Sequence, residues 1–227
     1  MEIIVAFWIK QLYKNKTTMI RLLIFMMVVG IIFPLSAQSR YSNIPDHLLK
    51  KANAAKDAVY LSQDEKDVIL YMNLARIDGK WFFKNVMEQN RDFIDYEQKQ
   101  YVNSLISDLK KTKNLSPLYP SKSLTKAARF HAKDMGETGK TGHHSSKGTD
   151  TFKRIGRYNN GNYQGENCQY GYREPVLIVL DLLVDAGIPS VGHRKNILNP
   201  DFKFTGVAIE PHKEYDVNCV MDFSDLE

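Results

Sequence analysis

The chain has 227 residues, with 31 lysine and arginine against 26 aspartate and glutamate side chains, a formal net charge of +5. This length suits one domain of ordinary size with short extensions, large enough to bury a core. Beyond the first 37 residues the chain has 27 basic against 25 acidic residues, a net charge of +2. Such a balance gives no electrostatic case for nucleic-acid binding, which usually needs a strongly basic face.

The N-terminal segment predicts export. Arg21 precedes an uncharged apolar run, Leu22–Leu35, which is followed closely by the small residue Ala37. Fourteen apolar residues match the central part of a signal peptide and fall short of the roughly 18 of a membrane-spanning helix. We therefore predict a signal peptide over residues 1–37, with Met19 as an alternative start, and a protein that is secreted or held in the cell envelope. The competing interpretation is a retained helical anchor, which would be the only part in contact with a membrane.

The two cysteines leave two alternatives open. Cys168 and Cys219 are an even pair in a chain expected to meet an oxidising compartment, so a disulfide between them and two buried free thiols are both compatible with the sequence. Neither lies in a Cys-x-x-Cys sequence, which disfavours a thiolate zinc site.

In chain order, residues 38–61 are predicted to be a polar lead-in segment and residues 62–227 a single domain. Ser62 and Glu65 form a capping box, in which each side chain satisfies a backbone donor of the other residue, and apolar residues then recur at helical spacing. We expect an amphipathic helix to begin here and to end at Gly79.

Two further helices are expected before residue 140. Tyr101, Leu105 and Leu109 recur every four residues, which predicts a helix that runs to about Lys113. The next helical pattern carries His131 on its apolar face. Because helices bury their apolar faces, we expect His131 to be a hydrogen-bonded core residue rather than a catalytic one.

Residues 114–120 and Thr138–Gly161 are predicted to be loops. The second is rich in glycine, serine, threonine, asparagine and lysine, the composition of a surface connection. Loops of this length in compact domains are usually functional or disordered. This one contains His143 and His144.

A strand and a helix follow the long loop. A strand over Tyr163–Tyr170 would place Glu166 and Cys168 on one face, because side chains alternate along a strand. The helix after it contains Asp181 and Asp185, which are four residues apart and are therefore expected on one side.

Two strands, Phe204–Glu210 and Val217–Phe223, complete the chain. In the second, alternate residues are expected to face the core and to leave Asp222 on the other face: Val217, Cys219, Met221 and Phe223. Several helices followed by a small, mainly antiparallel sheet with one helix inside its sequence predict an α+β fold in layers.

An interrupted helical run, Leu182–Leu198, is the sequence feature around which a site can be organised. The helix is expected to end at Gly187, Pro189 prevents its continuation, and Gly192 precedes His193 in a second short helix. Two upstream sequences also place titratable groups beside a glycine: Gly142-His143-His144 and Gly165-Glu166-Asn167. Together these sequences predict one polar site with contributions from distant parts of the chain.

Five short motifs carry a family resemblance: Ala127-x-x-x-His131-Ala-x-Asp134-Met135, Gly142-His143 with Gly148 and Arg154, Gly165-Glu166-Asn167, Gly192-His193-Arg194-x-Asn196-Ile197-Leu198, and Gly206-Val207-Ala208. Present together and in this order, they resemble the CAP superfamily, which groups cysteine-rich secretory proteins, antigen 5 and pathogenesis-related 1 proteins. The chain is most similar to the bacterial branch, whose domains are also called SCP domains. The dense match covers residues 124–223.

The resemblance implies an α-β-α sandwich, with the small sheet between helical layers, and an open cavity lined by two histidines and two acids. Carried over by position, these are His143, Glu166, Asp185 and His193. Asp185 is one methylene shorter than the glutamate of relatives outside bacteria, which puts its reach in question. Three further residues remain secondary candidates: His144, Asp181 and Arg194.

Two imidazoles and two carboxylates can support three kinds of chemistry. His143 and His193 could bind a divalent metal, and nitrogen and oxygen ligands suit Zn²⁺. The same groups could exchange protons with a bound water near neutral pH. They could also form a purely structural polar network.

We favour a secreted, non-enzymatic binding module for a lipid, a cell-wall fragment or a protein partner, because pockets with a few convergent polar groups are usually binding sites. The alternative is a peptidase-like hydrolase in which Glu166 or Asp185 acts as a base on activated water. No serine or cysteine lies in a nucleophile motif and no His-Glu-x-x-His sequence is present. Fold similarity alone does not choose between these functions.

Overall fold

A computed structural model describes residues 40–94 and 98–227 of the chain. The predicted signal peptide, Met19 and the proposed cleavage position lie outside the described residues. None of the described helices combines the length and the apolar character needed to cross a membrane. Residues Asp46–Glu227 form one compact unit, separate from Met1–Pro45, and the description below concerns this unit.

Two helices open the unit, α2 (Asp46–Ala52) and α3 (Gln63–Ile77), which pack against each other. The predicted capping box is present, since Ser62 Oγ accepts from Glu65 N at 3.2 Å and Ser62 N donates to Glu65 Oε2 at 2.8 Å. Helix α3 is buried along most of its length and forms the centre of one helical layer. It ends two residues before Gly79, which instead begins the next helix.

That next helix, α4 (Gly79–Phe82), lies directly against α5 (Lys99–Lys111). A Cβ atom on Gly79 would lie 2.2 Å from the carbonyl oxygen of Leu109, so only glycine permits this approach. Two short helical segments separate the two helices: η1 (Phe83–Met87) and η2 (Glu88–Phe93). Helix α5 ends two residues before the predicted Lys113.

The sheet has four strands in the order β1-β3-β4-β2. Its long strands are β2 (Gln164–Tyr170), β3 (Phe204–His212) and β4 (Asp216–Ser224), and they pair in antiparallel fashion. The two-residue strand β1 (Tyr119–Pro120) is parallel to β3 and lies in a segment predicted to be a loop. Two residues are too few to show the alternating pattern by which a strand is recognised in a sequence.

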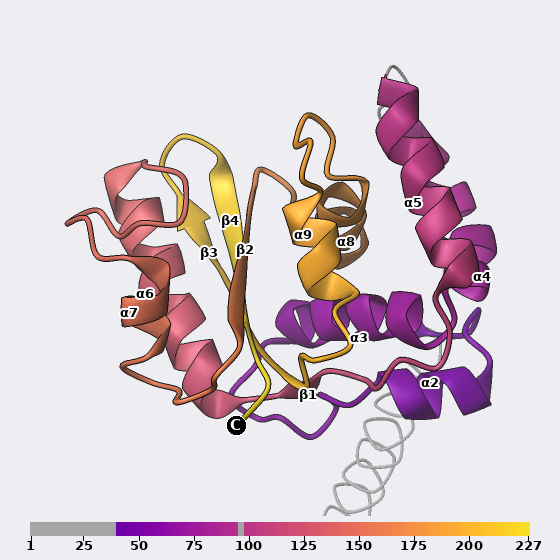
Figure 1. The fold of residues 1–227 in the computed structure, drawn as a ribbon, viewed down its shortest axis with the longest axis horizontal. Coiled ribbons are helices and arrows are strands. Elements are labelled where there is room, and N and C mark those ends of the chain that lie inside the picture. Colours follow the sequence, from indigo (N-terminus) through magenta and orange to yellow (C-terminus); the bar gives the residue numbers. More distant parts are fainter. Residues whose placement is uncertain (1–39, 95–97) are drawn as a thin grey trace, which may run out of the picture. The chain divides into compact units, whose positions relative to one another are not determined.

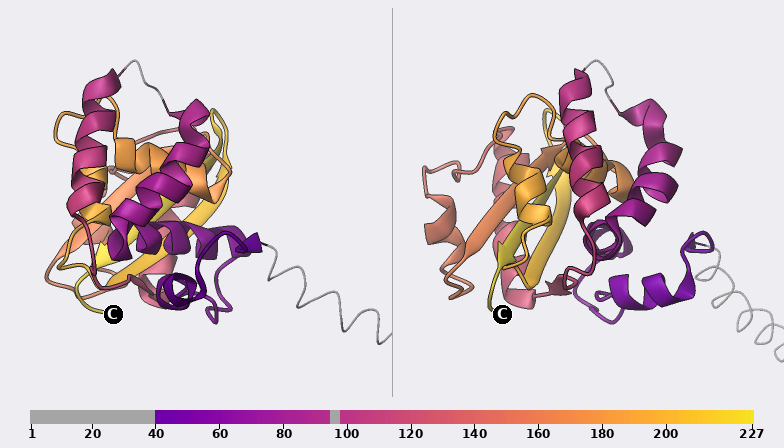
Figure 2. Two further views of the ribbon diagram at one scale, coloured as in Figure 1. Left: turned by 90° about the vertical axis from the view of Figure 1, so that its right-hand side faces the viewer. Right: turned by 45° about the vertical axis from the view of Figure 1, so that its right-hand side comes forward.

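Helices cover both faces of the sheet. Figures 1 and 2 show α6 (Lys122–Thr138) and α7 (Thr151–Ile155) on one side of the strands, and α3 with α8 (Pro175–Val184) on the other. On β3, a Cβ on Gly206 would lie 2.0 Å from the backbone nitrogen of Thr125, so α6 sits directly on the strand. The predicted α-β-α sandwich is confirmed.

The two cysteines lie on opposite faces of the sheet. Cys168 is opposite Val220 in the β2–β4 register, whereas Cys219 is opposite Gln169. Because neighbouring positions of a strand point to opposite faces, the two sulfur atoms cannot meet. Both thiols are free and buried, so the disulfide alternative is wrong and the alternative of two buried free thiols holds.

One buried arginine joins the first helical layer to the loops beside it. The guanidinium of Arg76, on α3, donates to the carbonyls of four residues, at 2.7 to 3.1 Å: Ser116, Ile197, Asn199 and Phe202. Burial lowers the pKa of Arg76 to about 10. Three segments separated in sequence therefore meet at one side chain: α3, the loop at Ser116 and the stretch from Ile197 to Phe202.

Candidate functional site

Glu166 lies at the centre of the candidate site, on β2, with 1% of its side chain exposed. Its Oε1 accepts from His143 Nδ1 at 3.0 Å, and its Oε2 accepts from Arg154 Nη2, on α7. Burial alone would raise the pKa of Glu166, but the hydrogen bond from His143 and the positive charge of Arg154 outweigh it and lower the pKa. Glu166 is therefore an ionised carboxylate with both oxygens bound.

His143 is held in place although it belongs to a loop. Gly142 N donates to Tyr170 Oη at 2.9 Å, and Gly142 O accepts from His131 Nε2 at 2.8 Å. His143 O in turn accepts from Thr151 Oγ1 at 2.9 Å. These bonds tie both sides of His143 to the sheet and to α6 and α7, and 47% of its side chain remains exposed.

The second histidine forms a matching pair with an acid. His193, on α9 (Gly192–Ile197), donates from Nδ1 to Asp185 Oδ1 at 2.8 Å, and its backbone N–H donates to Asp185 Oδ2 at 2.9 Å. The Asp185 side chain is 1% exposed and that of His193 is 22% exposed. Asp185 therefore orients His193 and also binds the N-terminal end of its helix.

The predicted position of Asp185 is only partly right. Helix α8 ends at Val184, earlier than the predicted Gly187, and Asp185 follows it in the left-handed conformation at φ 56°. Aspartate tolerates this conformation better than most residues. The left-handed turn directs the short carboxylate toward α9, which explains how aspartate reaches a histidine eight residues away.

The two histidine–acid pairs face each other across the gap between loop and helix. The ring centroids of His143 and His193 are 6.1 Å apart, and the ring planes are inclined at 37°. Both rings use Nδ1 for a buried carboxylate, and among the described residues neither Nε2 has a protein partner. The arrangement leaves the two Nε2 atoms without a protein partner, on a half-exposed ring at His143 and a less exposed one at His193.

Asparagines join the strand that carries Glu166 to the helix that carries His193. Asn167 Nδ2 donates to His193 O at 3.0 Å, and Asn196 Nδ2 donates to Glu166 O at 3.2 Å and to Asn167 Oδ1 at 2.8 Å. Because these amides bond to backbone atoms of both acid–histidine pairs, they fix the separation of the two halves of the site.

A model of the cysteine-rich secretory protein (CAP) family matches residues 72–223. The chain belongs to this family. The uncharacterized protein YkwD of Bacillus subtilis (strain 168) is 33% identical over 114 residues, which are 50% of this chain and 42% of that protein. The chain therefore spans less than half the length of this curated relative.

Two solved structures are also similar to this CAP domain. One is an outer surface protein from Borrelia burgdorferi, with 25% identity and a TM-score of 0.44 over 59% of this chain and 97% of that one. The other is an extracellular protein containing an SCP domain from Bacillus anthracis, with 26% identity and a TM-score of 0.42 over 56% of this chain and 39% of that one.

A second buried acid of this CAP domain lies beside the site. Asp222, on β4, is directly opposite Glu166 in the strand register, and its Oδ2 is 3.6 Å from Arg154 Nη1. Burial raises the pKa of Asp222 well above its usual range, and the neighbouring Glu166 raises it further. Two carboxyl groups thus share one arginine. Strand alternation placed Asp222 on the face of β4 away from the core-facing residues, a face that would be expected to contact solvent. In the structure, α6 buries that face as well.

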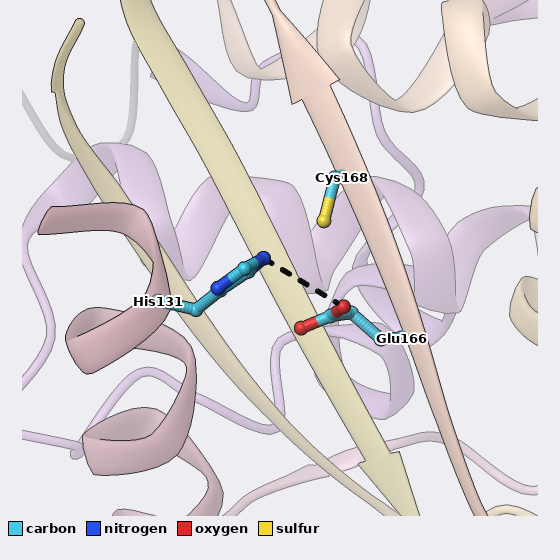
Figure 3. Close-up of side chains that lie close together, drawn as sticks. All are labelled: His131, Glu166 and Cys168. Atoms are coloured by element: carbon cyan, nitrogen blue, oxygen red, sulfur yellow. Dashed lines mark ion pairs between the residues drawn. The ribbon is translucent and has the colours of Figure 1, made fainter. Parts of the chain in front are cut away.

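A metal could be held, by distance alone, at His131, Glu166 and Cys168, whose ligand atoms all lie within 4.8 Å of one another (Figure 3). The protonation states of His131 and Cys168, however, do not suit metal binding. His131 Nε2 bonds to a carbonyl, so it carries the proton, and burial lowers the His131 pKa. Burial also raises the pKa of Cys168 well above its usual range, which keeps the thiol protonated. His131 is thus a hydrogen-bonded core residue, as predicted.

The secondary candidates lie elsewhere. His144 is exposed beside His143. Asp181 accepts from Gln169 Nε2 at 3.3 Å, and within the described part of the chain it forms no hydrogen bond with His143 or His193. Arg194 is buried, donates to the C-terminal carbonyls of α8 at Leu183 and Val184, and pairs with Asp108 at 2.9 Å. Arg194 therefore both caps a helix end and binds a carboxylate.

Proposed function

We propose that this CAP domain is an exported binding module whose ligand is bound by the Nε2 atoms of His143 and His193. The observation that supports the proposal is that each Nδ1 is bound to a buried carboxylate, which leaves Nε2 as the ring nitrogen available to a ligand. Export is supported by the signal-peptide character of the first 37 residues.

A divalent metal, Zn²⁺ in particular, fits this donor set. Histidines that bind zinc usually donate their other ring N–H to a carboxylate, which fixes the ring and makes the free nitrogen a better ligand. Glu166 and Asp185 have this role toward His143 and His193. Two histidines supply fewer ligands than the four that zinc prefers, so the remaining positions would be open to solvent or to a carboxylate or phosphate group of a partner.

The alternative hydrolase needs a carboxylate that can accept a proton from water. Both oxygens of Glu166 are already bound by His143 and Arg154, and the Glu166 pKa is lowered, which makes it a weak base. Asp185 accepts from His193 Nδ1 and from backbone N–H groups of α9. Because neither acid has a free oxygen directed at bound water, these contacts favour binding over hydrolysis.

Calorimetric titration of tag-free protein with Zn²⁺ tests the proposal. One site per chain is expected, and the His143→Ala/His193→Ala variant should lose it. His144→Ala is the matched control, because it removes a neighbouring exposed histidine and should leave the titration unchanged. Unaltered zinc binding in the double variant, or turnover of a peptide or peptidoglycan substrate that Glu166→Gln abolishes without unfolding the protein, would overturn it.

A further inference from the structure

Three adjoining hollows lie along the segment Lys111–Leu115, which begins at the last residue of α5. Their volumes are about 550, 540 and 490 Å³. The first and second share Lys111 and Lys113, and the second and third share Ile77 and Asn114. Neighbouring hollows thus share lining residues, and we call the three together the lysine band. It contains neither of the site histidines.

The residues that line the band are strongly basic. Arg194 and eight lysines line it against only Asp78 and Asp108, a surplus of seven positive charges: Lys50, Lys51, Lys56, Lys80, Lys110, Lys111, Lys113 and Lys195. Residues 38–227 together carry a surplus of only two, so the rest of this range is net negative. The surplus of positive charge is therefore concentrated around these three hollows.

The lysines of the band are largely unpaired. All eight side chains belong to exposed residues, and within the described chain only Lys56 forms an ion pair, with Asp57 at 4.0 Å. Of the two lining acids, Asp78 caps α4 by accepting from Trp81 N, and Asp108 pairs with Arg194. Neither acid therefore forms an ion pair with a lysine of the band, and Lys110 Nζ instead lies 5.6 Å from the centroid of the Phe83 ring.

Helix ends explain part of this charge. Lys50 and Lys51 lie in the last turn of α2, Lys110 and Lys111 in that of α5, and Lys195 in that of α9, where cations interact favourably with the helix dipole. Lys50 and Lys51 line the same hollow as Asn114 and Leu115, which follow α5 in the chain. The convergence of these helix ends, with additional lysines between them, is what builds the band.

We propose that the lysine band binds an extended phosphodiester polymer that carries no aromatic bases, such as a polyol phosphate. Lysine binds phosphate as a point charge, and successive hollows lined by one sign of charge suit a chain of regularly spaced anions. Only one aromatic residue, Tyr119, lines the hollows, so there is no platform on which successive nucleic-acid bases could stack. Concave hollows also fit a chain better than a flat lipid surface.

Titration of the full domain with fluorescently labelled poly(glycerol phosphate), at salt from about 50 to about 200 mM, tests the proposal. The variant Lys111→Gln/Lys113→Gln/Lys195→Gln should bind roughly tenfold or more weakly at the lower salt. Its slope of log affinity against log salt should be shallower by about 2, or about 0.7 per lost lysine contact.

A matched variant on α6, Lys122→Gln/Lys126→Gln/Lys133→Gln, removes the same charge from exposed positions outside the band and should bind as the wild type does. A second band variant, Lys50→Gln/Lys51→Gln/Lys56→Gln, should also weaken binding. Equal weakening by the α6 variant would show that net charge alone is measured and would overturn the proposal. Equal affinity for single-stranded DNA, or binding to anionic vesicles without binding to the polymer, would overturn it as well.

Discussion

The replacement Arg154→Met is the most direct test of how the site is supported. Arg154 is fully buried and provides a charged partner for Glu166, whose side chain is 1% exposed. Burial favours the neutral form of Asp222, so Glu166 is the charge that loses its partner. Removing one member of a buried ion pair costs about 3–5 kcal/mol. For a domain of this size, about 2–4 °C per kcal/mol corresponds to a fall in Tm of about 6–20 °C.

Urea unfolding followed by far-UV circular dichroism measures this cost. Arg157→Met, at a nearby exposed position, is the control and should change the free energy of unfolding by about 0.5 kcal/mol or less. The double variant Arg154→Met/Glu166→Gln should be less destabilised than Arg154→Met, because it no longer buries an unpaired charge. Without Arg154, burial raises the Glu166 pKa, so the deficit should shrink as the pH falls from about 7 to about 4.

Two results would refute this reasoning. One is a cost for Arg154→Met of less than about 1 kcal/mol, which would mean that Glu166 finds another partner or is reached by water. The other is a double variant no more stable than Arg154→Met, which would mean that lost packing, not an unpaired charge, causes the damage.

Three further outcomes are expected. Asp222→Asn should raise Tm relative to the wild type, and the increase should be larger at pH 7 than at pH 4. The raised folded-state pKa of Asp222 stabilises the wild type only at low pH, and this contribution is lost as the pH rises. Parallel Tm–pH curves for the two proteins would contradict this. Asp185→Asn should weaken zinc binding by about 10–100-fold in calorimetry, because His193 loses its charged partner; an unchanged affinity would mean that His193 is not a ligand. Both thiols should resist Ellman's reagent in the native protein and react after guanidinium unfolding, because they are buried and burial raises the pKa of each; rapid native reaction would show that β2 or β4 opens.

Three of the four main site residues, His143, Glu166 and His193, could be predicted because each belongs to a short motif, whereas Asp185 was placed only by its position in the family resemblance. Gly-Glu-Asn on a strand and Gly-His-Arg at a helix start located Glu166 and His193 before any fold was known. Arg154 was identified only by its offset from His143. Its role as the counter-ion of Glu166 depends on α7, a five-residue helix inside a predicted loop.

Other features could not be predicted because they arise from tertiary packing. Strand alternation indicates two faces, but not that α6 buries the second one, so Asp222 was missed as part of the site. Net charge is a sum over the chain, and a value of +2 gives no sign of lysines gathered where α2, α5 and α9 end. The left-handed conformation of Asp185 ended α8 early, although the sequence marked Gly187 as its end.

The family is named after its cysteines, but in this chain it is three buried arginines that connect distant segments. Arg76, Arg154 and Arg194 each join segments that are far apart in sequence, whereas the two thiols point to opposite faces of the sheet. Such cross-links form without oxidants and survive reductants. With Cys168 and Cys219 both free, we expect the Asp46–Glu227 unit to keep the same Tm in the presence and absence of a reductant.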